Sequence, residues 1–415
     1  MTSREPPAQR GVTRRAVLAG VGALALGGTA TAIAETVPWQ RAARPEKPPA
    51  PVEFYGDHQP GIATTPPSAL VLTAFDLATN DRASLVDLLK RWSSAAEALM
   101  RGELLDTSTG SSARLRDSGE TRGLPPASLT LTVGFGPGAF DAMPELVGKK
   151  PPGLSPIPPM RGDALDDARG GGDLVVQACA DDEMVAFHAT RQLTRLAKGI
   201  ATPRWSQRGF GATTDVHRSQ TPRNLFGQKD GTANPQPGTL GFDPVVWVQP
   251  GDSPPWMVGG AYLAVRRIRM DLDRWDLAAA SQQNKALGRD TVTGAPLSGG
   301  GEFSAPDFGA TDNVGQLTIP ADAHIRVANP AFNDAAEMLR RGYSYDDGYT
   351  DDRRRDAGLI FMAYVRDVPQ QFTPVLRALT ERDAMHAFLT HAASAAFAIP
   401  PGCQPGGFLG DTLLG

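Results

Sequence analysis

Cysteine and histidine are scarce in this chain of 415 residues, which holds two cysteines and six histidines. Cys179 and Cys403 lie too far apart for the paired spacing of a zinc site, and two cysteines do not make a disulfide framework. Cys179 falls within the apolar run 174–180, so we expect it to be a small buried hydrophobic residue.

The chain also lacks an excess of positive charge. Its 41 Lys and Arg residues face 45 Asp and Glu residues, which gives a net charge of −4. Because nucleic-acid binding depends on neutralising phosphates with a basic surface, the composition excludes nucleic acid as an expected partner. The apolar fraction of 41% is sufficient for a large packed core.

A long, strongly apolar run is absent from the amino terminus. Arg14 and Arg15 precede a weakly apolar, Gly/Ala-rich stretch that ends in Ala32-Ile33-Ala34. We interpret residues 1–34 as a twin-arginine signal peptide, cleaved after Ala34. A retained membrane anchor stays open, although such an anchor needs roughly 20 strongly apolar residues.

The twin-arginine export machinery is then a partner, and the destination is the periplasm, the exterior or the cell envelope. Because this route carries folded proteins, it also favours a bound cofactor. The dense prolines of residues 35–67 predict a linker that leads into the first strand.

Apolar and β-branched patterns predict the elements of the first half. Residues 68–78, 128–135 and 173–180 read as strands. Helices are expected at 81–102, with Asp81 as the cap, and at 182–198.

A similar order begins again at Gly260. Residues 261–270 and 357–367 read as strands, and residues 273–288 and 369–389 as largely helical. The predicted fold class is α+β, with two ferredoxin-like units of antiparallel sheet that resemble a dimeric α+β barrel. The predicted domains are residues 68–215 and 216–415.

Between the two halves lies the loop 224–235, which places Asp230 in a Gly-x-x-Asp-Gly string from Gly227 to Gly231. The two glycines permit a close approach of the backbone to a ligand. Taken alone, the string is weak evidence, because Asp-Gly is a common turn dipeptide.

Two further strings change the interpretation. One runs from Ala323 through His324 to Pro330, and the other is Arg340-Arg341-Gly342-Tyr343. Together with the loop and the stretch 358–364, they resemble the dye-decolourising haem peroxidases. With the export signal, the resemblance covers nearly the whole chain and points to the exported, deferrochelatase/peroxidase-like branch of that family.

The resemblance implies that the cofactor is haem b, held in the C-terminal half, with His324 as the proximal iron ligand. It implies Asp230 and Arg341 as the catalytic pair on the distal face. Arg340 is the nearest competitor, and family spacing favours Arg341.

Further site residues follow from the same resemblance. Gly227 and Gly231 are expected near the cofactor, Arg326 and Asn329 near its propionates, and Phe361 in the distal pocket. Surface pairing of Arg326 and Asn329 and ordinary core packing of Phe361 are equally open.

The chemistry of these residue types fits peroxide cleavage, which needs a group that moves a proton and a cation that stabilises charge on the departing oxygen. A carboxylate that a nearby guanidinium holds ionised can move the proton, and the guanidinium itself is the cation. The expected activity is reduction of hydrogen peroxide with oxidation of dyes, phenols or other one-electron donors. Because bulky donors do not enter a buried pocket, Tyr343, Tyr345 and Tyr364 are candidate exits for electrons.

Other interpretations stay open. The same residues are compatible with a deferrochelatase that releases iron from haem and works with iron-uptake components. A haem carrier would need His324 but not the aspartate and arginine, and a chlorite-decomposing enzyme would not need the Gly-x-x-Asp-Gly loop. The remaining histidines are expected in helices (His188, His386, His391) and in loops (His58, His217).

Overall fold

The computed structural model describes residues 50–105 and 117–415. The predicted signal peptide 1–34 and residues 35–49 of the predicted linker lie outside the described residues. Within the part that is described, none of the helices combines the length and the apolar character needed to cross a bilayer.

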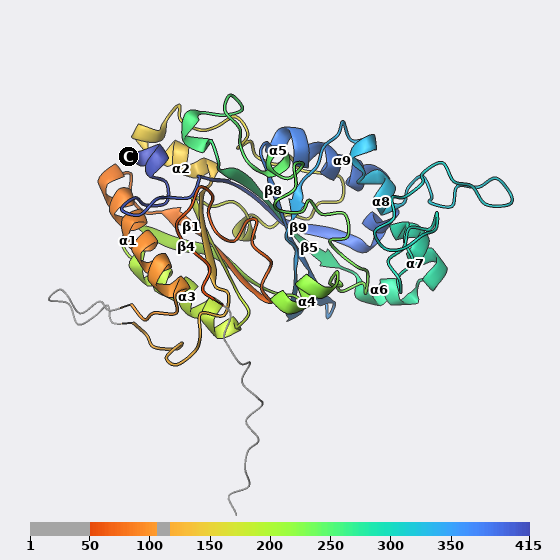
Figure 1. Cartoon of the computed structure of the whole chain (residues 1–415), viewed down its shortest axis with the longest axis horizontal. Coiled ribbons are helices and arrows are strands. Elements are labelled where there is room, and N and C mark those ends of the chain that lie inside the picture. Colours follow the sequence, from red (N-terminus) through yellow and green to blue (C-terminus); the bar gives the residue numbers. More distant parts are fainter. Residues whose placement is uncertain (1–49, 106–116) are drawn as a thin grey trace, which may run out of the picture. The chain divides into compact units, whose positions relative to one another are not determined.

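The first half contains four strands, with two long helices packed on one face of their sheet (Figure 1). Asp81 caps the first helix as predicted, because its carboxylate accepts a hydrogen bond from the Ser84 amide at 2.8 Å. The elements are β1 (Ala69–Leu77), α1 (Arg82–Met100), β2 (Thr130–Phe135), the short α2 (Pro137–Ala142), β3 (Leu174–Ala180), α3 (Glu183–Leu196) and β4 (Ala201–Phe210).

The second half contains five strands and shorter helices. Its strands are β5 (Ala261–Met270), β6 (Leu339–Arg340), β7 (Tyr343–Tyr349), β8 (Arg355–Val365) and β9 (Leu389–Ile399). Its α-helices are α4 (Thr214–Ser219), α5 (Asp243–Val246), α6 (Leu272–Leu277), α7 (Ala280–Leu287), α8 (His324–Val327), α9 (Thr373–Arg382) and α10 (Asp411–Leu414).

All the strands join in one antiparallel sheet with the order β5-β9-β2-β3-β1-β4-β7-β8-β6, and pairing of β5 with β8 closes it into a barrel. Single residue pairs, Phe135 with Ala398 and Phe210 with Ser344, join the two halves. The α+β class with antiparallel strands is confirmed. Along the sheet, each half places its four main strands in the order fourth, first, third, second.

The buried apolar side chains form three clusters. One lies under α1 and α3 and includes Trp92, and a second fills the barrel interior and includes Cys179, which is fully buried as predicted. The third is a small cluster in which Phe226 stacks on Trp275 at a centroid distance of 4.3 Å.

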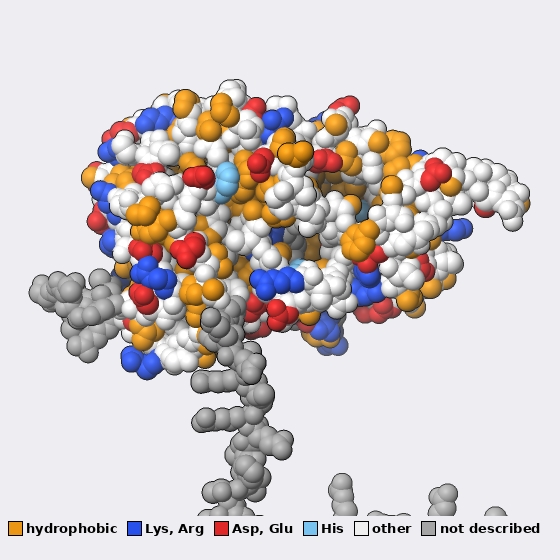
Figure 2. All heavy atoms as spheres, viewed as in Figure 1, with side chains coloured by type: hydrophobic (Ala, Val, Ile, Leu, Met, Phe, Trp, Pro, Cys, Tyr) orange, Lys and Arg blue, Asp and Glu red, His pale blue; other side chains and the backbone are white. Residues whose placement is uncertain are grey.

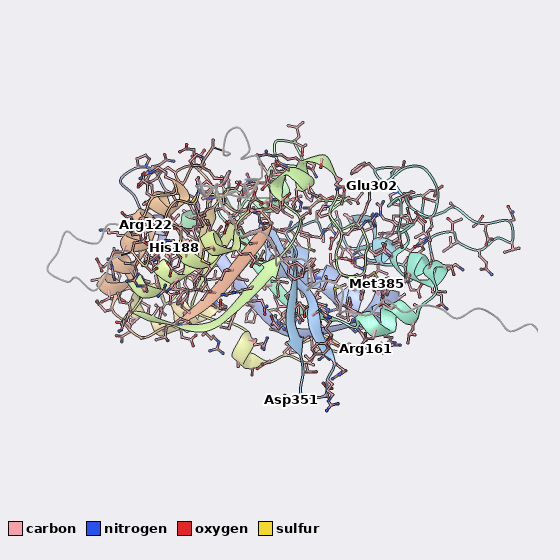
Figure 3. All side chains as sticks on the ribbon, turned by 90° about the horizontal axis from the view of Figure 1, so that it is seen from below. Arg122, Arg161, His188, Glu302, Asp351 and Met385 are labelled. Atoms are coloured by element: carbon pink, nitrogen blue, oxygen red, sulfur yellow. The ribbon has the colours of Figure 1, made fainter. Side chains whose placement is uncertain are left out.

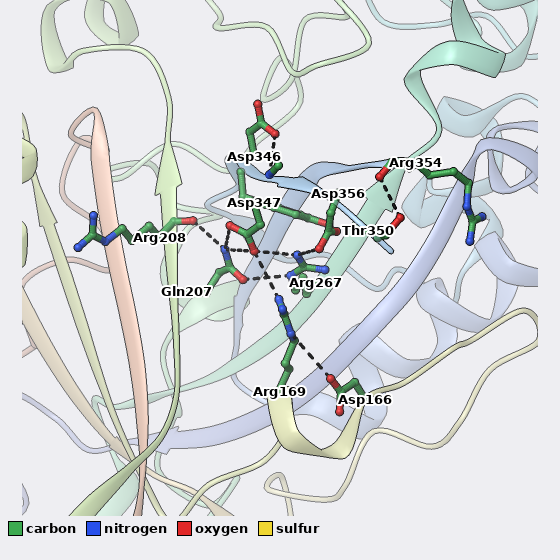
Figure 4. Close-up of polar contacts among 12 residues, drawn as sticks. Asp166, Arg169, Gln207, Arg208, Arg267, Asp346, Asp347, Thr350, Arg354 and Asp356 are labelled. Atoms are coloured by element: carbon green, nitrogen blue, oxygen red, sulfur yellow. Dashed lines mark hydrogen bonds and ion pairs between the residues drawn. The ribbon is translucent and has the colours of Figure 1, made fainter. Parts of the chain in front are cut away.

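A polar network surrounds the buried Arg267 of β5 (Figure 4). Its Nη2 donates to Asp347 and Asp356, each at 2.9 Å, and its Nε donates to Gln207. The guanidinium also lies 4.0 Å from the centre of the Tyr345 ring. This network ties β4, β5, β7 and β8 together where ladder pairing between the halves is thinnest.

Several elements differ from the prediction. The predicted helix 273–288 divides into α6 and α7 at Ala278 and Ala279, where the Gln282 side chain accepts from the Ala279 amide. Strands β4, β6, β7 and β9 were not predicted. His391 was predicted in a helix and lies in β9, whereas His217 was predicted in a loop and lies in α4.

The predicted linker 35–67 includes a segment that packs as part of the folded unit. Phe54 and Ile62 are buried, and the buried Gln59 side chain donates to the carbonyls of Val133 and Pro400. Prolines disfavour helix and ladder pairing, but they permit this irregular segment to cover the barrel through side-chain hydrogen bonds.

Candidate active site

The loop that carries Asp230 is anchored in the third apolar core. Phe226 is its buried anchor, and the Trp275 Nε1 donates to the Phe226 carbonyl at 3.2 Å. Gly227 has a φ of 73°, which suits glycine, and its amide donates to the Asn224 carbonyl. Gly227 therefore serves the turn and does not line the cavity described below.

Asp230 faces Arg340 across this loop. Their closest ion-pair distance is 3.9 Å from Nη1 to Oδ1, and their side chains are 28% and 34% exposed for Arg340 and Asp230 respectively. Asn234 fixes the two segments together, because its side chain accepts from the Arg340 amide and donates to the Arg340 carbonyl, each at 2.8 Å. These two hydrogen bonds therefore fix the loop, and with it the Asp230 carboxylate, beside β6.

Arg341, the arginine predicted beside Asp230, points to the other side of the strand. β6 and β7 pair with β8 in one continuous register, Arg340 with Ala363 and Tyr343 with Ile360. Because side chains alternate along a strand, Arg341 and Tyr343 face the barrel interior and Arg340 faces outward.

Arg341 is 3% exposed, and its Nη1 donates to the carbonyls of Ile62 and Thr64. The structure therefore does not pair Arg341 with Asp230: Arg340 is the arginine that pairs with Asp230 and lines the same cavity as His324.

His324 is the first residue of α8, and its ring is held by a carboxylate that the sequence did not identify. Nδ1 lies 2.6 Å from Asp383 Oδ2, and Asp383 is 7% exposed. Burial lowers the pKa of His324, but the charge and hydrogen bond of Asp383 outweigh it and raise that pKa overall. Because an ionised carboxylate only accepts, Nδ1 carries a proton and the free lone pair of the ring is left on Nε2.

His324, Asp230 and Arg340 line one cavity of about 270 Å³. Its walls are largely apolar and come from α7, α8, β8 and α9 and from the segment around Met385, a residue labelled in Figure 3. The apolar wall residues include Leu287, Ile325, Met338, Phe361, Phe372, Val375, Leu376, Leu379 and Met385.

The donor set fits a haem group. Nε2 of His324 is a nitrogen of the kind that binds iron, the apolar walls suit a macrocycle, and the buried Arg289 in the same wall offers a cation for a carboxylate. Nearby, Glu302, also labelled in Figure 3, holds the loop through Lys229 and Thr232.

The other predicted site residues divide into two groups. Gly231, Asn329 and Phe361 line the cavity. Arg326 does not, because its guanidinium donates to the carbonyls of Phe308, Ile319 and Pro320. Arg326 therefore lies outside this cavity, and its guanidinium holds the segment 308–320 that precedes α8.

The three tyrosines proposed as electron exits are all at most 1% exposed. Burial raises the pKa of each phenol. Tyr343, Tyr345 and Tyr364 all belong to the barrel interior, so they are internal residues and none presents its ring at the surface.

Comparison with known proteins gives the family. Models of the N-terminal and C-terminal parts of Dyp-type peroxidases match residues 59–211 and 221–404. The dye-decolorizing peroxidase of Thermobifida fusca (strain YX) is 37% identical over 439 residues, with 99% of each chain covered. The deferrochelatase of Escherichia coli (strain K12) is 35% identical over 419 residues, with 97% of each covered.

Among solved structures, a DyP-type peroxidase from Streptomyces coelicolor is 42% identical, with a TM-score of 0.83 over 88% of this chain and 96% of that one. The matches run along almost the whole sequence. This chain belongs to the Dyp-type peroxidases, a family of haem enzymes.

Proposed function

We propose that this protein is a haem b peroxidase that reduces hydrogen peroxide and oxidises dyes, phenols or other one-electron donors. The observation that carries the proposal is that His324, Asp230 and Arg340 line one largely apolar cavity. A haem carrier has no use for an aspartate and an arginine beside the ligand, so their presence there favours turnover.

In this proposal, His324 Nε2 binds the iron and Asp383 keeps the ring oriented and electron-rich. Asp230 accepts a proton from the bound peroxide, and the Arg340 guanidinium stabilises negative charge on the departing oxygen. Haem, when bound, supplies the electrons for O–O cleavage and regains them one at a time from the donor. The apolar walls exclude bulk water, which strengthens both electrostatic effects.

The site also supports the finer prediction of the fold. The strand order repeated in the two halves is the order of a ferredoxin-like unit, and we propose residues 68–215 and 216–415 as two such units. The haem then belongs to the second, because its cavity is lined by residues 224–385.

Asp230→Asn tests the peroxidase function. We expect the rate of peroxide reduction to fall by about 100- to 10,000-fold, the usual loss when a general base is removed. The measurement is steady-state oxidation of a phenol with hydrogen peroxide by the haem-loaded protein. Asp276→Asn, an exposed aspartate of α6 outside the cavity, is the control. Equal activity in the Asp230 variant and the wild type would refute the assigned role.

Deferrochelatase activity is the second candidate, favoured by the similarity to deferrochelatases along 97% of the chain. The same reaction separates the two activities, because a peroxidase leaves haem intact and accumulates oxidised donor. A chelatase releases iron and metal-free porphyrin. Ferrous iron captured by a chromophoric chelator, in step with porphyrin fluorescence, would favour the chelatase.

We propose export by the twin-arginine route, on the strength of Arg14 and Arg15 before the apolar run. Replacing both with lysine is expected to leave the full-length chain in the cytoplasm, because the export machinery reads the arginine pair. Cell fractionation with an antibody to the mature chain provides the measurement. Unchanged export of the double variant would show that another route carries the protein.

A further inference from the structure

His188 lies on α3, in the first half of the molecule, and takes no part in the proposed haem site. In Figure 3 it lies well apart from Met385, which lines the haem cavity. Its side chain is 1% exposed and faces two carboxylates, Asp117 and Glu120. One donor atom from each of these three side chains lies within 4.8 Å of the other two.

The Glu120 carboxylate fixes the proton on the imidazole of His188. Nδ1 lies 2.7 Å from Glu120 Oε2, and it carries the proton because an ionised carboxylate only accepts. Glu120 is itself held by Ser118 and Arg191, which contact its two oxygens. Burial lowers the pKa of His188 despite the charge of Asp117, so the ring is neutral at neutral pH. The lone pair of the ring is therefore on Nε2.

This Nε2 faces a carboxylate oxygen without bonding to it. Asp117 Oδ2 lies 3.3 Å away, yet the buried Nε2 forms no hydrogen bond with any of the described residues. Two atoms that both present lone pairs repel at this distance unless a proton or a cation lies between them. A shared proton would place the oxygen on the axis of the Nε2 lone pair, and the missing hydrogen bond indicates that the oxygen lies off that axis.

Asp117 is a second buried group whose charge is not balanced. Its side chain is 7% exposed, and its two oxygens accept hydrogen bonds from the backbone amides of Leu105 and Gly119, at 2.8 and 2.6 Å. Within residues 50–105 and 117–415, no Lys or Arg forms an ion pair with it. Because a buried charge is costly unless it is paired, a cation between Asp117 and His188 would satisfy both groups at once.

The separation of the two atoms suits a transition-metal ion. Zinc binds imidazole nitrogen at about 2.0–2.1 Å and carboxylate oxygen at about 2.0–2.2 Å, so two such ligands in tetrahedral geometry lie roughly 3.3–3.5 Å apart. Nε2 of His188 and Oδ2 of Asp117 lie 3.3 Å apart. An ion bonded to both lies along the Nε2 lone pair and leaves the oxygen off that axis. The imidazole favours zinc or a similar ion over Mg²⁺ and Ca²⁺, which prefer oxygen ligands.

We propose that Asp117 and His188 bind one divalent transition-metal cation, with Glu120 as the residue that positions the imidazole. A carboxylate behind a metal-bound histidine orients the ring and makes it a stronger donor. Two protein ligands leave the remaining coordination positions to water. The ion fastens the segment 117–120 to α3. Because none of these residues lines the haem cavity, the site does not depend on the proposed function.

Exposed carboxylates are the competing source of metal binding. On the face drawn in Figure 2, Asp and Glu side chains are scattered among Lys and Arg side chains. Such groups offer oxygen alone, so they do not select zinc over an excess of magnesium. A site that includes the buried imidazole of His188 does select zinc, and this difference separates the two sources.

The test is isothermal titration calorimetry of zinc into the full, untagged, haem-loaded chain, with excess magnesium to fill oxygen-only sites. The variants are Asp117→Asn, His188→Gln and Glu120→Gln. The matched control is Glu183→Gln, at an exposed carboxylate of the same helix, which removes one negative charge as Asp117→Asn does. Circular dichroism checks the fold of each variant, and the Soret band checks its haem.

We expect the wild type and Glu183→Gln to bind one equivalent of zinc with the same Kd. Glu120→Gln should raise that Kd about 10- to 100-fold, the usual loss when the group behind a histidine ligand is changed. Asp117→Asn and His188→Gln each remove a ligand, so they should raise the Kd by at least about 100-fold. The haem spectrum should be the same in all five proteins.

The proposal is overturned if the wild type shows no saturable zinc site in excess magnesium, since His188 is then a histidine packed between two carboxylates and nothing more. It is equally overturned if His188→Gln or Asp117→Asn keeps the wild-type Kd, or if Glu183→Gln weakens binding as much as they do. Those results would assign the zinc to other groups. If either ligand variant fails to fold, Glu120→Gln decides, and an unchanged Kd in that variant contradicts the proposal.

Discussion

Arg340→Leu is expected to slow the reaction with peroxide by about 100- to 1000-fold, the loss typical of removing one preorganised group that stabilises developing charge. The guanidinium faces Asp230 and lines the cavity of His324. Stopped-flow absorbance of the haem-loaded protein, mixed with hydrogen peroxide, gives the second-order rate constant directly.

Arg341→Leu is the matched control, because the two arginines are adjacent in sequence and face opposite sides of the strand. Arg341 is buried and donates to the carbonyls of Ile62 and Thr64, so its loss is expected to destabilise the fold by about 1–3 kcal/mol. Its peroxide rate should stay near that of the wild type. A slow Arg341 variant beside a fast Arg340 variant would reverse the assignment.

His324→Ala is expected to lose the haem, and Asp383→Asn to bind it about 10- to 100-fold more weakly. The alanine removes the only imidazole that lines the cavity among the described residues. The asparagine keeps the shape of the side chain but removes the negative charge of Asp383, whose Oδ2 lies 2.6 Å from His324 Nδ1 and orients the ring. His386→Ala is the control, since His386 lies near Asp383 in sequence and does not line the cavity.

The distal arginine illustrates what spacing alone does not decide. Motif matching placed Arg341 beside the aspartate, and it had no means of choosing between two adjacent arginines. The choice depends on which side of a strand faces the barrel interior. That signal was present as the alternation of Arg341, Tyr343 and Tyr345, but it is readable only once the segment is recognised as a strand.

Asp383 was missed for a different reason. It lies 59 residues after His324, and nothing near it in sequence resembles a site. Only the packing of α9 against α8 brings it to the ring. Residues 50–67 were likewise predicted to be a linker because of their proline content. Their burial depends on partners that are distant in sequence, such as Val133 in β2 and Pro400 after β9.

The strands predicted correctly, such as β1 and β5, are buried runs rich in aliphatic residues. β9 escaped prediction because its alanines favour helix in isolation. In the barrel it lies between β5 and β2, where pairing along β5 outweighs that local preference. β4 alternates polar exposed residues with few buried ones, which is a weak pattern for a strand.

Titration of haem into the purified chain, followed by absorption spectroscopy for the wild type, His324→Ala and His386→Ala, tests the central claim most directly. The account predicts one-to-one binding with a histidine-ligated spectrum in the wild type and the His386 variant, and loss of that spectrum in the His324 variant. The same spectrum and affinity in all three proteins would contradict it.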